Sequence, residues 1–336
     1  MDKRTRLIST IEGKEVDRPP VCFWFHFEGR RASGEGTVRA HLDYYRHSNP
    51  DFLKCQSDGF FPFPLELPIT SASDWKHLRP LSRQHPYVAD QVERVRRIND
   101  ALHGECCTYY TVFAPFSSIR FATSDELVMA HFRENPKAVA QALETVAETN
   151  MVVAQSIIRE GGCTGIFLSL QGGEENRFSS DEYRELISPS ELRVLSAANE
   201  ASRFNIGHLC AWAGVRNHLE VWRDYPFPVV NWAVHIEGMS LAEGKQYFGG
   251  RTVMGGFDNR KQGVIFRGSE AEIKRATREI LTANPGPGLI ISADCSLQME
   301  SDIDLDHILW VVEAAQEWAD HGSGKQNRTT AGKSPA

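Results

Sequence analysis

The alternation of apolar and polar positions divides the chain into short apolar runs and longer amphipathic segments. Eight runs rich in β-branched and aromatic residues have the length of buried strands, and they occupy residues 19–25, 51–56, 106–113, 162–170, 205–211, 228–234, 252–257 and 289–295. Amphipathic stretches, with apolar residues every three or four positions, occupy residues 88–104, 136–162, 188–203, 269–283 and 304–319. The pattern predicts strands that alternate with helices.

This alternation favours a parallel sheet, and near-continuous apolar strands indicate a sheet that is covered on both faces. Eight units predict an α/β fold, a (β/α)8 TIM barrel with an N-terminal helical extension and long βα loops. An open doubly wound sheet is the alternative, but no GxGxxG phrase follows the first run. We expect residues 1–320 to form a single domain and residues 321–336 to be a disordered tail, because that segment is small, polar and charged.

Two connections are longer than most in compact domains, and both are rich in proline and aromatic residues. They span residues 57–87 and 114–135. Connections of that length are usually functional loops or lids. Their phenylalanines either wall an apolar pocket or only cover the barrel mouth; they are Phe60, Phe61, Phe63 and Phe116, together with Phe113 at the end of the preceding run.

Composition narrows the class of partner. The chain has 336 residues, a net charge of -7 and scattered basic residues, so a nucleic-acid partner is not expected. No apolar stretch approaches about 18 residues and the first 20 residues lack an apolar signal region, so we expect no membrane association and a cytoplasmic location. The seven cysteines lack the dense spacing of a disulfide scaffold and are expected to be reduced.

The segment NIGHLCAW places a histidine and a cysteine two positions apart in an apolar run. Side chains two apart on a strand point to the same face, so His208 and Cys210 project together into the barrel mouth. Cys295 ends another run, also at a carboxyl end, where barrel active sites are built. One imidazole and two thiolates make a set typical of catalytic zinc, and the sulfurs favour zinc over magnesium or calcium.

Other interpretations of these cysteines remain open. Buried cysteines are common core residues, and a disulfide between Cys210 and Cys295 is conceivable but disfavoured in a reducing compartment. The remaining cysteines are interpreted as core residues, since they lie within apolar runs or at the start of one; they are Cys22, Cys55, Cys106, Cys107 and Cys163.

Six phrases, in chain order, resemble the uroporphyrinogen decarboxylase superfamily. They are EGKEVDRPPV, EGGCTGIFLSLQGG, SSDEYRELISPSE, GHLCAW, VMGGFD and ISADCSLQMESDIDLDHI, and the resemblance extends over residues 3–320. That superfamily has a (β/α)8 barrel fold. One branch decarboxylates uroporphyrinogen III without a cofactor. The other consists of zinc-dependent corrinoid methyltransferases, such as methylcobamide:coenzyme M methyltransferase.

The resemblance is stronger to the methyltransferase branch, whose zinc ligands are a His-x-Cys pair and a distant cysteine. His208, Cys210 and Cys295 stand at those places. The implied function is methyl transfer between a corrinoid (cobalamin) and a small substrate, with zinc activating a thiol acceptor or polarising a methoxyl-type donor. Because the chain lacks a corrinoid-binding DxHxxG phrase, the corrinoid is expected on a separate protein.

Two alternatives stay open. Asp58 resembles an aspartate of the decarboxylases, so a metal-free uroporphyrinogen-type decarboxylase is the first alternative. A zinc- or corrinoid-binding protein without catalysis is the third hypothesis. The oligomeric state, a homo-oligomer included, is not determined.

Polar residues after several runs complete the predicted site. Asp58 and Gln171 are the catalytic candidates, and the substrate-binding candidates are His26, Glu28, Asp58, Gln171, His235 and Asp258. A hydrogen-bonded or capping role explains several of them equally well. A fourth protein ligand is doubtful, with His235 and Glu237 the nearest candidates.

Overall fold

The computed structural model describes residues 1–322. Its last helix, α13 (Leu305–Gly322), extends two residues into the segment predicted as a tail, and residues 323–336 of that segment lie outside the described residues. Within residues 1–322, no helix is both long and apolar enough to cross a membrane.

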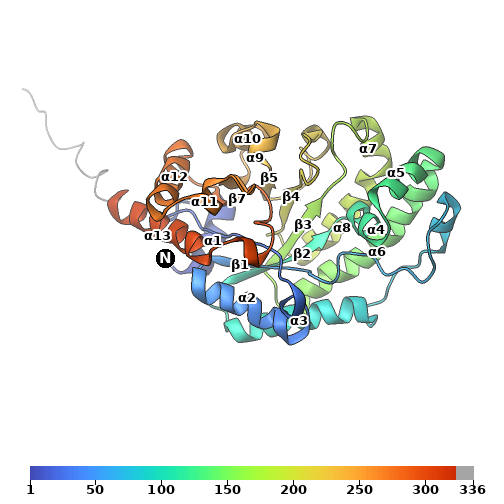
Figure 1. Ribbon diagram of the computed structural model, residues 1–336, viewed down its shortest axis with the longest axis horizontal. Coiled ribbons are helices and arrows are strands. Elements are labelled where there is room, and N and C mark those ends of the chain that lie inside the picture. The colour runs from blue at the N-terminus through green and yellow to red at the C-terminus, as the bar shows by residue number, and fades with distance from the viewer. Residues whose placement is uncertain (323–336) are drawn as a thin grey trace, which may run out of the picture.

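A curled parallel sheet of seven strands forms the centre of the described chain, and it is compatible with a TIM-barrel-like fold (Figure 1). Neighbours in the sheet are neighbours in sequence. The strands are β1 (Phe52–Cys55), β2 (Cys107–Phe113), β3 (Gly165–Leu170), β4 (Ile206–Leu209), β5 (Val229–Trp232), β6 (Thr252–Phe257) and β7 (Leu289–Ala293). Seven of the eight predicted runs are therefore regular strands.

The first run, residues 19–25, is not a regular strand, which corrects the prediction of eight. It lies against β7, where the N–H of Cys22 donates to Ile291 O at 3.1 Å and the N–H of Ile291 donates to Pro20 O at 2.9 Å. On the β1 side, the N–H of Val21 donates to the Asp51 carboxylate at 2.8 Å. A side chain thus replaces part of the backbone ladder, and Pro19 and Pro20 have no N–H to donate. The segment still contacts both edges of the sheet.

Helices surround the outer side of the sheet (Figure 1). Helices α2 and α13, from opposite ends of the chain, lie side by side. His47 Nε2 of α2 is 2.8 Å from an Asp306 carboxylate oxygen of α13, and Ser48 Oγ donates to Leu305 O. Besides α13, the helices are α1 (Lys3–Ile11), α2 (Gly34–Ser48), α3 (Pro86–Leu102), α4 (Pro115–Ala122), α5 (Asp125–Glu134), α6 (Pro136–Arg159), α7 (Ser180–Leu186), α8 (Ser188–Ala201), α9 (Val234–Glu237), α10 (Leu241–Tyr247), α11 (Val264–Arg267) and α12 (Glu270–Ala283). All five predicted helical stretches are helices.

One predicted connection is itself helical. Residues 114–135 form α4 and α5, because Pro115 is well placed in the first turn of one helix and Ser124 caps the other by accepting from Leu127 N–H. Residues 57–85 remain a long connection with one 3-10 turn, Ala72–His77.

Two buried clusters lie on the two sides of the sheet. The larger one packs the strands against the helices. The smaller one fills the concave side, with Phe52, Tyr109, Phe167, Ile206, Val229, Met254 and Ile290 from the seven strands. Leu7 and Ile11 of α1 belong to the same cluster, so α1 covers the amino ends of the strands.

The concave side changes from apolar to polar toward the carboxyl ends. Two positions after six of these seven inward apolar residues, on the same face, stand buried polar side chains; they are Lys54, Thr111, Ser169, His208, Asn231 and Ser292, while Gly256 follows Met254. The sheet therefore places a polar layer at the end where barrel active sites are found.

Candidate metal centre

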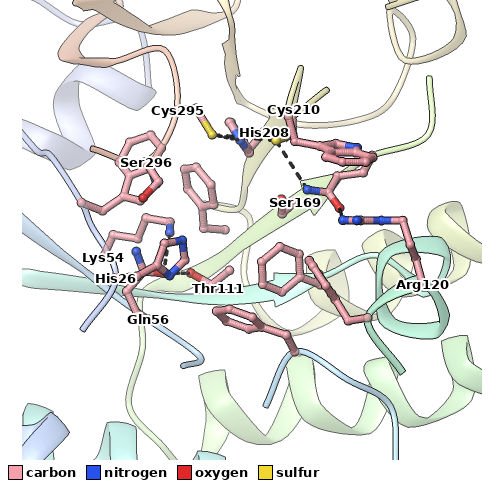
Figure 2. A pocket seen from close by; sticks show the side chains of 17 residues that line it. His26, Lys54, Gln56, Thr111, Arg120, Ser169, His208, Cys210, Cys295 and Ser296 are labelled. Carbon is pink, nitrogen blue, oxygen red and sulfur yellow. Dashed lines mark hydrogen bonds between the residues drawn. The ribbon is translucent and has the colours of Figure 1, made fainter. Parts of the chain in front are cut away.

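The predicted ligand set comes together at the carboxyl ends of β4 and β7 (Figure 2). Cys295 Sγ lies 3.3 Å from His208 Nε2 and 3.8 Å from Cys210 Sγ. All three ligand atoms lie within 4.8 Å of one another. Both cysteines are free thiols, and their sulfurs are too far apart for a disulfide of about 2.05 Å.

A hydrogen bond from a neighbouring strand fixes the tautomer of His208. Its Nδ1 lies 2.5 Å from Asn231 Oδ1, and the two residues are paired in the β4–β5 register. The Asn231 amide nitrogen donates to Met254 O at 2.8 Å and to Ala293 O at 3.2 Å, so its oxygen is left as an acceptor. His208 must therefore carry its proton on Nδ1, and the lone pair on Nε2 faces the two sulfurs.

The Cys210 sulfur is supported from the opposite side. Gln171 Nε2 donates to Cys210 Sγ at 3.5 Å, and Arg120 Nη2 donates to Gln171 Oε1 at 2.6 Å. The guanidinium holds the amide oxygen, and this leaves the amide N–H pointing at the sulfur. A donor in that position would stabilise a Cys210 thiolate once a bound cation has offset the effect of the neighbouring Cys295 sulfur.

The pKa values of the two thiols shift in opposite directions. Donation by Cys210 lowers the pKa of the Cys295 thiol, and the same contact raises the pKa of Cys210 well above its ordinary value. One sulfur is thus deprotonated readily and the other resists a second adjacent negative charge, which a bound cation would neutralise.

This donor set fits zinc. Two thiolates, one imidazole and an open fourth position are the composition of catalytic zinc sites. Neither predicted candidate for a fourth protein ligand belongs to the cluster. His235 N–H and Nδ1 are hydrogen-bonded to Asp294, at 2.9 and 2.8 Å, and Glu237 accepts from the Asn217 amide at 2.7 Å.

The ligand set lines a cavity of about 270 Å³ (Figure 2). Part of the lining is an aromatic wall: Phe61, Phe113 and Phe121 contact one another with ring centroids 4.9 to 5.5 Å apart. Trp212, 40% exposed, also lines the cavity. Among the described residues, none of the 17 that line this cavity is Asp or Glu.

Two of the predicted polar residues act together at one side of the cavity. His26 lines it, and its Nδ1 lies 2.8 Å from an oxygen of Asp58. The other Asp58 oxygen accepts from the N–H of Phe27 at 2.9 Å. Asp58 is buried behind His26 and does not line the cavity, so the structure places it as a residue that orients His26.

Three predicted substrate-binding residues lie elsewhere. Glu28 is exposed and accepts from Ser301 Oγ at 2.7 Å. His235 and Asp258 line a second cavity of about 520 Å³, beside β6 and α12, where Asp258 is paired with Arg260. The Asp294 carboxylate, hydrogen-bonded to the His235 ring, raises the pKa of His235. Of the predicted substrate contacts, His26 and Gln171 are those that line the cavity with the ligand set.

Sequence reasoning missed Lys54, Asn231 and Arg120. Lys54 and Asn231 are polar residues inside the apolar runs DFLKCQ and PVVNWAV, at inward positions, and that was the available signal. Lys54 is 3% exposed and burial lowers its pKa to about 7. Arg120 could not be found in this way, because the sequence predicts a loop for its segment, residues 114–135.

The fold is shared with several enzymes. A solved structure of a methyltransferase from Methanosarcina mazei is similar, with a TM-score of 0.72 and 16% identity over 95% of this chain and 99% of that chain. A B12-independent methionine synthase from Shewanella sp. W3-18-1 has a TM-score of 0.52 at 13% identity, covering 86% of this chain and 87% of that chain. A β-mannanase from the blue mussel Mytilus edulis also reaches 0.52, at 9% identity over 90% of this chain and 92% of that chain. At such identities the likeness shows the fold alone.

The sequence comparison identifies the family. No curated protein matches the chain. The family model described as uroporphyrinogen decarboxylase (URO-D) matches residues 61–318, which include all three candidate ligands. By that match over most of its length, the chain belongs to the uroporphyrinogen decarboxylase family.

Proposed function

We propose that this protein is a zinc-dependent methyltransferase that moves a methyl group between a corrinoid, carried by a separate protein, and a small substrate. The observation that carries the proposal is the convergence of His208, Cys210 and Cys295 within 4.8 Å, with Asn231 leaving the His208 Nε2 lone pair free. In this proposal the fold is a (β/α)8 barrel in which residues 19–26 take the place of the eighth strand.

The chemistry expected of the bound metal follows from its ligands. Zinc in such a site offers a coordination position where a thiol is held as thiolate near neutral pH, or where a methoxyl oxygen is polarised. His208, Cys210 and Cys295 would hold it.

The other side chains of the site orient the candidate ligands, exclude water and offer a group for proton transfer. Asn231 keeps the imidazole in one tautomer, and Gln171 keeps an N–H on the Cys210 sulfur. The aromatic wall of Phe61, Phe113 and Phe121 excludes water from its part of the cavity. His26, oriented by Asp58, presents its other ring nitrogen as a group that can give or take a proton.

The cavity also suits a partner that brings its own cofactor. Trp212 is 40% exposed at the lining, so the cavity is accessible from outside. A corrinoid protein docked over this opening would have access to the ligand set and could supply or take the methyl group there.

Metal analysis tests the proposal first. Wild-type protein purified under reducing conditions is expected to contain about one zinc ion per chain, and Cys210→Ser and Cys295→Ser are expected to lose it. Cys163→Ser is the matched control: Cys163 is a buried thiol that accepts from Thr108 Oγ1 at 3.5 Å, and its replacement should keep the zinc.

Methyl transfer is the second readout. Zinc-loaded protein is expected either to move the methyl group of methylcobalamin onto a small thiol, leaving cob(I)alamin, or to move the methyl group of a methoxyl compound onto cob(I)alamin, leaving the free hydroxyl compound. The absorbance change of the corrinoid reports either direction. Zinc-free wild type that decarboxylates uroporphyrinogen III would overturn the proposal in favour of the metal-free decarboxylase. Zinc binding without any methyl exchange would indicate the non-catalytic alternative.

A further inference from the structure

The cavity beside the candidate metal centre is positively charged. Lys54 and Arg120 line it, and Figure 2 shows them on opposite sides of it, with the cluster of His208, Cys210 and Cys295 lying between. Among residues 1–322, neither cation has a carboxylate within 4.0 Å. A zinc ion with two thiolates is neutral overall, so metal loading leaves the charge of the two cations uncompensated.

Lys54 is the more unusual of the two. It is 3% exposed, and its Nζ donates to Gln56 Oε1 at 3.1 Å. The remaining contacts of Nζ are the faces of Phe167, at 4.5 Å from the ring centroid, and Trp24, at 4.9 Å. An ammonium has three N–H groups, so at least one is left for a ligand in the cavity. Buried cations normally have a partner of opposite charge.

The nearby carboxylate does not supply that partner. Asp58 is hydrogen-bonded to His26 and to the N–H of Phe27, and it lies behind the cavity wall. Gln56 is neutral, and it also donates to Phe25 O at 2.9 Å. Another group near Lys54 that can carry negative charge is the Cys295 thiol, but a bound zinc ion would neutralise its thiolate, so the missing countercharge is on the cavity side of Lys54.

We propose that Lys54 binds the anionic group of the substrate, and that the substrate is a small organic acid with an apolar body. This inference rests on the proposed function and names the substrate class of the same site. The apolar body lies against Phe61, Phe113 and Phe121, and Arg120 adds a second positive charge near the opening. The volume of about 270 Å³ limits the ligand to a small molecule.

The charge of the cavity lining argues against a substrate with a methylammonium group. Aromatic walls attract methylammonium groups through cation–π contacts. Here the lining holds two cations and, among the described residues, no Asp or Glu, so an ammonium would be repelled. An anion favours the charged form of Lys54, because an opposite charge nearby raises the pKa of an ammonium.

Calorimetric titration of zinc-loaded and metal-free wild type with matched ligands tests this inference. The first series is 4-methoxybenzoate, 4-methoxybenzamide and 4-methoxybenzylamine. The second is 3-mercaptopropionate, 3-mercaptopropanol and 3-mercaptopropylamine. In at least one series the acid is expected to bind about 10-fold tighter than the neutral analogue, and the amine weakest. The series that shows the preference identifies the acid as a methoxyl donor or a thiol acceptor.

Variants assign the preference to Lys54. Lys54→Met is expected to reduce the preference for the acid to about twofold or less, and Lys54→Arg should retain part of it. Lys14→Met removes the same charge from an exposed residue and should leave the preference unchanged. The inference is overturned if neither acid binds better than its neutral analogue, or if Lys54→Met keeps the preference.

The outcome is separable from that of the proposed function. Protein that contains zinc but shows no preference for the acids would contradict the role of Lys54 and leave the proposed methyl transfer standing. Protein that lacks zinc but still prefers the acids would contradict the zinc-dependent methyl transfer and leave the role of Lys54 standing.

Discussion

Replacement of Asn231 by alanine should weaken zinc binding through His208. The substitution removes the acceptor at 2.5 Å from His208 Nδ1, so the ring can rotate and its proton can move to Nε2, the nitrogen that faces the sulfurs. Loss of such an outer hydrogen bond typically costs 10- to 100-fold in metal affinity, which corresponds to about 1.4 to 2.7 kcal/mol.

The same substitution should also destabilise the metal-free fold. Asn231 is fully buried and donates to Met254 O and Ala293 O, and both carbonyls would lose this donor. At roughly 1 to 3 kcal/mol for each unsatisfied buried group, we expect a loss of about 3 kcal/mol in the free energy of unfolding. Zinc affinity is measured by competition with a chromogenic chelator, and stability by urea unfolding of metal-free protein.

Asn205 provides the matched control. It is equally buried, accepts from Ile166 N–H at 2.9 Å and donates to Ser202 O at 2.7 Å, but it precedes β4 at the opposite end from the ligands. Asn205→Ala should lower stability comparably and leave the zinc affinity of the folded protein unchanged. The tautomer argument fails if Asn231→Ala binds zinc as tightly as wild type, or if both variants lose the same affinity.

Two further predictions concern neighbouring contacts. Gln171→Leu removes the N–H that donates to Cys210 and should weaken zinc binding about 3- to 10-fold in the chelator assay; unchanged affinity would contradict it. Glu191 accepts from Tyr183 and Tyr225, and burial raises its pKa from 4.5 to about 7. Because its folded pKa lies above the unfolded value, the metal-free fold should lose up to about 3 kcal/mol as pH rises from 4.5 to 7. Glu191→Gln should flatten that slope in urea unfolding, and equal slopes in both proteins would refute the assignment.

The ligand set could be predicted because its geometry follows from two simple rules. Side chains two apart share a strand face, which unites His208 and Cys210, and carboxyl ends of parallel strands meet, which adds Cys295. The closure of the sheet was harder to predict. Residues 19–25 have strand composition, but Pro19 and Pro20 lack donors and the carboxylate of Asp51 replaces a strand partner at Val21.

The residues around the ligands depend on side-chain reach, which periodicity does not encode. Asn231 and Lys54 could have been noticed as polar residues at inward positions, but their partners, at His208 and at Gln56, come from packing. Arg120 reaches Gln171 from α4, a helix that strand and helix periodicity did not reveal. The order of the runs likewise places His235 and Asp258 after predicted strands, but it does not show that they line a separate cavity.

The candidate metal ligands and the positively charged residues of the cavity come from different stretches of the chain. The candidate metal ligands lie at the carboxyl ends of β4 and β7, whereas the cations that line the cavity come from β1 and α4. Under the proposed function, a mutation at Lys54 or Arg120 alters which molecule binds without changing the three candidate metal ligands. Reaction type and substrate charge are then inherited separately, and relatives that keep the His-x-Cys pair and the distant cysteine but differ at these two positions are expected to apply the same chemistry to molecules of different charge.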